Sequence, residues 1–301
     1  MKSEPSQYVD RRSGQIRTDP IYASAFLDWC YNNRVGWFLT WQVLRRAFIS
    51  RLYGWYCQRR WTRRGIPGFV EQLNIDTSDC LQPLSSYRSF NDFIIRAIDL
   101  TSRPIDPNEA TCVSPVDGRV WVEPAITLDQ LFTIKTATFQ LGSFLRDATL
   151  ASAFDGGTLY VFRLYLGDYH HFHFPDSGTP RATRTLPGSY FAVTPYSRRW
   201  LVPYFAENHR HVTLFDSTHF GQMVLVEVGA FTVGSIQQCF TPGKPIAKGD
   251  HKGHFELGGS IVVLLFAKGR IEIDDDLLAN SKNGLETYVR LGESIGRTTQ
   301  Q

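Results

Sequence analysis

The sequence predicts an α+β protein in which a helical N-terminal part, rich in basic and aromatic residues, precedes a β-rich domain of sandwich-like or barrel-like form. Two observations carry this prediction. Residues 29–70 contain no acidic side chain, and within them residues 35–60 show helical spacing of their apolar residues. From Cys112 onward, short β-branched or aromatic segments alternate with Gly and Pro. We divide the chain into residues 1–80 and 81–301.

The composition is that of a folded globular protein. Of the 301 residues, 43% are hydrophobic and 20% are charged, which excludes a disordered chain. The net charge is only +3, so we expect no nucleic-acid partner. The five cysteines contain no C-x-x-C pair, which favours a reducing compartment without structural zinc. The polar start MKSEPSQYVD is not a signal peptide, and the chain has no run of 18 apolar residues.

Residues 29–70 have the composition of a helix that lies at a membrane surface. They hold five of the seven tryptophans and eight arginines. Within residues 35–60, the apolar side chains that fall on one helical face are Trp37, Trp41, Leu44 and Phe48. Pro67 is expected to end this pattern. Such a face either packs on the protein's own core or binds an anionic membrane, and the absence of acids favours the membrane.

The remaining chain is expected to form mainly strands. The segments GTLYVFRLYL, MVLVEVGAFTVGSIQQ and SIVVLLFAKGRIEI are β-branched or aromatic and are bounded by turn residues. FQLGSFLRDA is the one helix expected among them. The polar tail, residues 274–301, is expected to hold at most one short helix, around residues 285–291.

Three short segments carry residues suited to catalysis. SPVDG places Asp117 in a turn, YHHFHFP follows an apolar strand, and LGGS places Ser260 ahead of the apolar residues 261–266. Asp, His and Ser are the components of a nucleophilic triad, whatever their order in the chain. Each segment taken alone also has a structural interpretation, because Asp-Gly is a common turn and Gly-Gly-Ser a common bulge.

Two other functions fit the same segments. Clustered histidines are typical of metal sites, so one alternative is a metal-dependent β-barrel enzyme. Its candidate ligands are His170, His171, His173, His209 and His211. The second alternative is a non-enzymatic, membrane-binding β module whose Gly-rich turns are only structural.

Taken together, the three segments resemble the phosphatidylserine decarboxylase proenzymes. That family carries S-P-x-D-G, Y-H-x-x-H-x-P and G-S segments in this order. The segments SFNDFIIR, RPID, VEVGAFTVGSI and LETYVRLGESIG support the resemblance, which covers roughly residues 80–296. Two positions depart from it, since Ile261 follows the serine where Thr is usual and His171 stands where Arg is common.

The resemblance implies a pyruvoyl-dependent carboxy-lyase that makes its own cofactor and needs no metal. His173 would act as base and Asp117 would orient it. Ser260 would attack the carbonyl of Gly259, cut the chain there and become the covalent pyruvoyl group. The products would be a β chain, 1–259, and an α chain, 260–301. His170 would donate a proton during the later decarboxylation.

The implied reaction converts phosphatidylserine to phosphatidylethanolamine and CO2 in phospholipid biosynthesis. Relatives of the family act on free amino acids, which remain the alternative substrate. The Trp- and Arg-rich segment favours the lipid, because that substrate is held in a bilayer. We therefore expect a peripheral protein on the cytoplasmic face of a bacterial cell membrane, built as a heterodimer of its own two chains. A homo-oligomer remains open.

Overall fold

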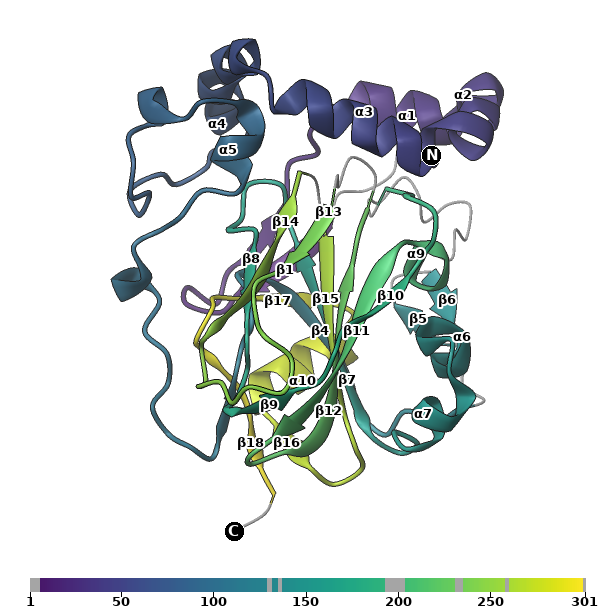
Figure 1. Ribbon diagram of the computed structural model, residues 1–301, viewed down its shortest axis with the longest axis vertical. Helices are drawn as coiled ribbons and strands as arrows, with labels where there is room; N and C mark the ends of the chain where they lie inside the picture. The colour runs from purple at the N-terminus through teal and green to yellow at the C-terminus, as the bar shows by residue number, and fades with distance from the viewer. Residues whose placement is uncertain are drawn as a thin grey trace.

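The computed structural model describes residues 6–128, 132–134, 137–192, 204–230, 235–257 and 260–299. Helices and a large sheet confirm the α+β class. Helices α1 (Ser24–Asn32), α2 (Arg34–Leu39) and α3 (Ala47–Cys57) lie across one end of the β-rich body, and the C-terminus lies at the other end (Figure 1).

The largest sheet is open and has the strand order β10-β11-β12-β15-β7-β4-β17-β1-β2, with β9 beside β11. The strands are β10 (Arg184–Leu186), β11 (Arg210–Ser217), β12 (Gly221–Val228), β15 (Ser260–Phe266), β7 (Thr158–Leu164), β4 (Gly118–Glu123), β17 (Glu286–Val289), β1 (Gln7–Asp10), β2 (Ile16–Thr18) and β9 (Gly178–Pro180). Only β1 and β17 pair in parallel among these. Since this path does not close within the described residues, the barrel-like form is excluded for them.

Smaller sheets complete the β-rich body. One has the order β13-β14-β8, another β16-β18-β3, and β5 pairs with β6. These strands are β13 (Ser235–Gln238), β14 (His251–Glu256), β8 (His171–His173), β16 (Ile271–Ile273), β18 (Ser294–Thr298), β3 (Thr111–Val113), β5 (Phe132–Ile134) and β6 (Ala137–Phe139).

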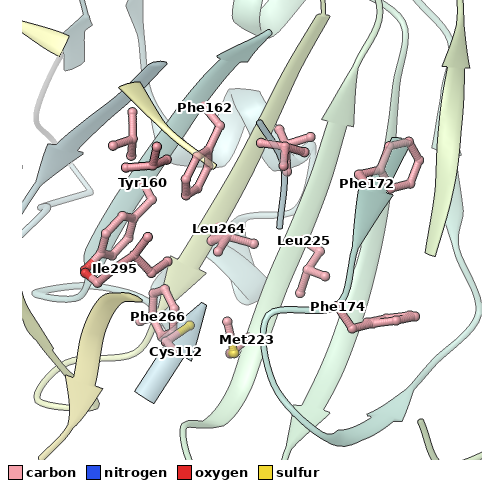
Figure 2. Packing of buried hydrophobic residues seen from close by; sticks show 14 of the residues in the cluster. Cys112, Tyr160, Phe162, Phe172, Phe174, Met223, Leu225, Leu264, Phe266 and Ile295 are labelled. Carbon is pink, nitrogen blue, oxygen red and sulfur yellow. The ribbon is translucent and has the colours of Figure 1, made fainter. Parts of the chain in front are cut away.

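Strand β15 separates two hydrophobic cores. Its even-numbered residues 262–266 face the first core, which contains Phe172 and Phe255 of the β13-β14-β8 sheet. Figure 2 shows Leu264 in this core together with Phe172. The odd-numbered residues 261–265 face a second core. It is covered by α6 (Leu141–Leu145) and α7 (Ala148–Ser152). Because side chains alternate along a strand, Ser260 faces the first core.

The N-terminal part differs in detail from the expected long helix. Besides its helices it contributes β1 and β2 to the large sheet. The predicted helix over residues 35–60 is divided into α2, a π-helical turn at Thr40–Leu44 and α3, because Arg46 has extended backbone angles. We expected Pro67 to end a helix, but it lies in the first turn of α4 (Ile66–Leu73). At that position a backbone N–H would have no partner within the helix, so its absence in proline costs nothing.

The predicted tail helix is wrong. Residues 286–289 form β17, in which Val289 enters the first core and Glu286 pairs with Arg163. The helix of this region is α10 (Asp275–Lys282). The predicted helix in FQLGSFLRDA is present as α6, but it is not the one helix among the strands, because α7 follows it directly. The other helical segments are α5 (Phe90–Ile94), α9 (Tyr204–Glu207) and 3-10 turns at Arg60–Gly65, Leu84–Ser86 and Leu100–Ser102.

Candidate active site

Ser260 is completely buried, and its hydroxyl group is left without a hydrogen-bond partner among the described residues. It begins β15, opposite Leu164 of β7, so both side chains lie on the same side of the sheet. Within the described part of the chain, its Oγ has no hydrogen-bond partner. A buried polar atom left unpaired costs about 1–3 kcal/mol, so its presence calls for a chemical explanation. A nucleophile provides one.

The backbone just before Ser260 is unusual. Gly258 and Gly259, which come just before the predicted cleavage point between Gly259 and Ser260, lie outside the described residues. Leu257 has a φ of 55°, in the left-handed region that residues with a Cβ rarely adopt. The chain therefore approaches the predicted cleavage point through a strained conformation, of the kind that occurs at functional sites.

Asp117 lies at the turn before β4 and is held by an arginine. Arg103 donates from Nε to both carboxylate oxygens at 3.0 Å, and from Nη2 to Oδ2 at 2.8 Å. The backbone N–H of Leu291 donates to Oδ1 at 2.8 Å. Arg103 also pairs with Asp79. Asp117 is thus a buried, ion-paired carboxylate whose oxygens are largely occupied.

His173 is oriented by a backbone carbonyl. Its Nδ1 donates to the carbonyl of Gly249 at 2.9 Å, which leaves Nε2 as the basic nitrogen. The hydroxyl of Tyr169 lies 3.4 Å from Nε2. Burial lowers the pKa of His173 to about 4, while the charge of Asp117 acts in the opposite direction. The imidazole is therefore neutral at pH 7.

The three predicted triad residues are not joined by hydrogen bonds among the described residues. Asp117 influences His173 through its charge. It does not accept a hydrogen bond from the ring, because Arg103 and Leu291 occupy its oxygens and Gly249 occupies Nδ1. Ser260 has no bonded partner. The structure therefore brings Asp117 and His173 into electrostatic contact and leaves Ser260 unconnected to them.

His170 lies on the same side as Ser260. It is completely buried, and its Nδ1 donates to the carbonyl of Asp168 at 2.9 Å. The N–H of Phe255 donates to the carbonyl of His170 at 2.9 Å, which extends the β8–β14 pairing by one residue. By strand alternation His170 shares the side of Phe172, which faces the first core. His171 and His173 face the opposite side of the strand.

An ionic network fixes the turn that carries His170. Arg119 pairs with Asp168 and, at 2.7 Å, with Asp19. Asp19 also pairs with Arg163 at 2.9 Å. The N–H of Tyr165 donates to the carboxylate of Asp168. Since the carbonyl of Asp168 orients His170, this network positions the histidine and joins it to the N-terminal segment.

An apolar cavity of about 440 Å³ is lined by neighbours of Ser260, although Ser260 itself does not line it. It lies between the N-terminal helices and the large sheet, and its lining includes Phe26, Tyr53, Leu164 and Leu257. Leu164 is the cross-strand neighbour of Ser260, and Leu257 precedes Ser260 by three residues. A cavity of this size and character suits an apolar ligand.

The N-terminal helices also present an exposed apolar and basic surface, which we call the Trp–Arg surface. Its exposed apolar residues are Phe26, Trp29, Val35, Phe38, Leu39, Trp41, Phe48, Leu52, Tyr53, Trp55, Tyr56 and Trp61. Its exposed arginines are Arg34, Arg46, Arg51, Arg60, Arg63 and Arg64. Among the described residues, no helix is long and apolar enough to cross a bilayer.

The histidines of the metal-enzyme alternative do not form one cluster. In the part of the chain that the structure describes, the only group of three or more potential ligands contains His171, His251 and His254. Of these, only His171 was among the five candidates. The pattern H-x-x-H at residues 251–254 could have indicated the two other histidines of this group. On a regular strand, however, residues three apart face opposite sides, so the spacing argues against a shared site.

Two further residues contact the candidate site but were not predicted as site residues, although the segments that contain them were already singled out in the sequence. Arg103 lies in RPID and Tyr169 in YHHFHFP. Tyr169 also stacks on His171, with 4.8 Å between ring centroids. The role of Gly249 rests on its carbonyl, which every residue type has, so no sequence signal could have identified it.

Comparison with known proteins defines the class as a decarboxylase. The family model described as phosphatidylserine decarboxylase matches residues 90–297, more than half of the chain. The chain therefore belongs to the phosphatidylserine decarboxylase family and is a carboxy-lyase, which confirms the resemblance seen in its motifs.

Three bacterial relatives illustrate the match, and each is named phosphatidylserine decarboxylase proenzyme. The chain is 41% identical over 298 residues to the protein of Chlamydia trachomatis serovar L2, covering 99% of both chains. It is 40% identical over 292 residues to that of Chlamydia felis, covering 97% of this chain and 98% of the relative. It is 38% identical over 290 residues to that of Desulfitobacterium hafniense, covering 96% and 97%.

Proposed function

We propose that this protein converts phosphatidylserine to phosphatidylethanolamine and CO2 after cutting itself between Gly259 and Ser260. One observation carries the proposal: the buried Oγ of Ser260, which has no hydrogen-bond partner in the described chain, lies on the side of the sheet where its neighbour Leu164 lines the apolar cavity. Family membership supports the decarboxylation, and the cavity supports a substrate with an apolar part.

The surroundings of Ser260 fit a pyruvoyl group formed from it. Conversion of Ser260 into a pyruvoyl group removes its hydroxyl group, so any hydrogen bond of that hydroxyl would be lost. Within the described residues the Oγ of Ser260 makes no hydrogen bond, so none is lost there. Pairing of β15 with β7 and β12 would hold the new chain end in place. Once formed, the group supplies a carbonyl that takes up the electron pair released with CO2.

Self-cleavage requires a base that takes up the proton of the attacking hydroxyl group. In our proposal His173 Nε2 takes the proton of Ser260, and Ser260 Oγ attacks the carbonyl of Gly259. Because Ser260 faces the first core and His173 faces away from it, one of the two side chains has to move before this transfer. The peptide bond shifts to an ester, and elimination of the ester leaves a dehydroalanine. Its hydrolysis releases ammonia and leaves the pyruvoyl group. Asp117 stabilises the protonated form of His173 through its charge, and the products are chains 1–259 and 260–301.

Decarboxylation requires a proton at the carbon that loses CO2. We assign this role to His170, which is buried on the side that Ser260 faces. Its Nδ1 is held by the carbonyl of Asp168, so Nε2 is the nitrogen that exchanges the proton. The network around Arg119 keeps Asp168, and with it His170, in this orientation.

The Trp–Arg surface explains how a bilayer lipid would reach the site. Phe26 and Tyr53 belong both to this surface and to the lining of the cavity. A lipid could therefore pass from the bilayer into the cavity without crossing water. The arginines of this surface would bind an anionic leaflet. We propose that the heterodimer of the two chains is a peripheral protein on the cytoplasmic face of a bacterial membrane.

Intact-mass analysis tests self-cleavage. Wild-type protein should yield a 42-residue fragment, residues 260–301. An added amine and a reducing agent should convert the ketone at its N-terminus into a stable adduct of higher mass. Ser260→Ala should leave one uncut, inactive chain. Ser281→Ala removes another buried serine and should be cut normally. An uncut wild-type chain with decarboxylase activity would contradict the mechanism.

Release of CO2 from two substrates tests the lipid. Phosphatidylserine vesicles should be decarboxylated, whereas free serine should not. Equal activity on free serine would favour the amino-acid alternative and remove the role of the cavity.

A further inference from the structure

Three histidines outside the proposed chemistry converge on one point. The ligating atoms of His171, His251 and His254 all lie within 4.8 Å of one another. Nδ1 of His171 and Nε2 of His251 are 2.9 Å apart. The Sγ of Cys239 lies 3.9 Å from Nδ1 of His254 but is not part of this group. The group faces away from the first core, on the outer side of the β8–β14 pair.

An irregularity in β14 creates this convergence. The register shifts between His251 and Gly253, so that His251 is paired with His173 and His254 with His171. At the bulge Lys252 turns inward and pairs with Glu227 at 2.8 Å. In a regular strand, residues three apart face opposite sides, and the bulge turns both histidines to one side.

The bulge itself depends on a glycine. A Cβ on Gly253 would lie 2.0 Å from the carbonyl oxygen of Gln237 on the neighbouring strand, so no other residue fits without moving the backbone. The convergence is therefore built into the strand pairing and does not depend on the side-chain rotamers alone.

One hydrogen bond of His171 is of the kind that metal-binding histidines make. Its Nε2 donates to the carbonyl of Ile95 at 3.0 Å, which fixes the ring and leaves Nδ1 as the nitrogen with the free electron pair. Metal-binding histidines typically donate their second ring nitrogen to a carbonyl or carboxylate in this way. Nδ1 of His171 points at His251, toward the centre of the group.

The spacing fits a tetrahedral transition metal. With Zn–N bonds of about 2.0–2.1 Å, ligand nitrogens lie roughly 3.3 Å from one another. The separations in the group, from 2.9 Å to at most 4.8 Å, span this value and need only small ring movements. Imidazole ligands suit Zn²⁺ and its neighbours and do not suit Mg²⁺ or Ca²⁺.

We propose that His171, His251 and His254 bind one Zn²⁺-class ion, with water as the fourth ligand on the exposed side of His251. The ion would join β8 to β14 and, through Ile95, to the segment after α5. It would brace the strand that carries His173 without taking part in the reaction. The proposal goes beyond the proposed function and does not depend on self-cleavage.

Titration of tag-free, chelator-treated protein with ZnCl2 in a calorimeter tests this site. Wild type and the uncut Ser260→Ala chain should each bind one equivalent, which keeps the result separate from the proposed function. His251→Gln and His254→Gln should weaken binding at least about 100-fold, more than loss of a supporting partner typically does. His209→Gln is the matched control, since His209 lies outside the group, and should bind Zn²⁺ like wild type.

Thermal unfolding gives a second measurement. Zn²⁺ should raise the Tm of wild type and of His209→Gln, but not that of His251→Gln, because a ligand stabilises only the state that binds it. His251 is exposed, so its replacement should leave the fold intact. Less than one equivalent in wild type, equal affinity in the His251 and His254 variants, or loss of binding in His209→Gln would each overturn the proposal.

Discussion

Arg103 donates hydrogen bonds to both carboxylate oxygens of Asp117. Its Nε lies 3.0 Å from each oxygen, and its Nη2 lies 2.8 Å from Oδ2. Asp117 was expected to orient His173, but its carboxylate is hydrogen-bonded to Arg103. The carbonyl of Gly249 orients the ring of His173 instead. Asp117 acts on His173 only through its charge. This arrangement keeps a buried negative charge stable before any reaction occurs.

Replacement of Arg103 should therefore destabilise the fold. Arg103→Met leaves Asp117 buried and unpaired, which typically costs about 3–5 kcal/mol. Urea unfolding measures the loss. Arg181→Met breaks an exposed pair with Asp216 and should cost at most about 1 kcal/mol. Similar losses in the two variants would show that the Arg103–Asp117 pair contributes no more than a surface pair.

The rate of self-cleavage should depend on pH through His173. Burial lowers the pKa of His173 to about 4, so the neutral, basic form persists well below pH 6. We expect the rate constant to be level between pH 7 and about pH 5.5 and to fall toward pH 4. Precursor made in a cell-free reaction, shifted to each pH and followed by mass spectrometry, gives this profile. A half-maximal rate near the ordinary histidine pKa, about 6.5, would point to an exposed base instead.

Acid should destabilise the folded chain before its carboxylates titrate. Burial lowers the pKa of His171 to about 3, and burial lowers the pKa of His173 and of His209 to about 4. Below about pH 6.5 the unfolded chain binds protons that the folded chain does not, so stability is lost as pH falls toward 4. The slope is up to about 1.4 kcal/mol per pH unit for each imidazole.

Urea midpoints at pH 7 and pH 5 measure this loss. His209→Asn should reduce the difference between the two midpoints, because one buried imidazole is removed. Identical midpoints for wild type at the two pH values would contradict the assignment.

Membrane binding should depend on the exposed arginines of the Trp–Arg surface. Arg45 and Arg59 are poor choices for a test, because they stack on Trp41 at 4.4 Å and on Trp55 at 3.9 Å. The exposed set to replace by Gln is Arg46, Arg60, Arg63 and Arg64. At about 1 kcal/mol each, their loss should weaken binding to anionic vesicles roughly 1,000-fold.

Vesicle sedimentation measures this change, and added salt should weaken wild-type binding. A matched control replaces four arginines elsewhere, Arg12, Arg181, Arg184 and Arg297, and should bind vesicles far more tightly than the first variant. Equal loss in both variants would show that total charge, not this surface, directs the protein to the membrane.

The apolar cavity can be filled without touching the proposed chemistry. Ser50 lines it, is buried, and has an Oγ with no partner in the described chain. Ser50→Leu should leave stability and self-cleavage intact, since it removes an unpaired hydroxyl and adds apolar contact. Decarboxylation of long-chain phosphatidylserine should fall about tenfold or more relative to a short-chain lipid.

Ser50→Ala is the control for this variant and should retain activity on both lipids. An unchanged preference for chain length in Ser50→Leu would show that the acyl chains bind elsewhere.

Short-range patterns predicted much of the fold. The apolar run after Ser260 became β15, and FQLGSFLRDA became α6. The failures lie where a distant partner overrode the local pattern. Residues 286–289 form a strand because Glu286 pairs with Arg163 and Val289 packs in the first core. The expected long helix is interrupted at Arg46, which has extended backbone angles, beside Arg45, whose carbonyl accepts a hydrogen bond from the N–H of Tyr190 at 3.0 Å.

By itself the sequence determined the family and the α+β class, and it led us to propose Asp117, His170, His173 and Ser260 as site residues, because these conclusions rest on residue type and order along the chain. Tertiary structure alone decided which atoms meet: Asp117 with Arg103, His173 with the carbonyl of Gly249, and His251 with His171. The physical reason is that burial and strand pairing join groups far apart in the chain. A backbone carbonyl or a β-bulge leaves no signature in residue type.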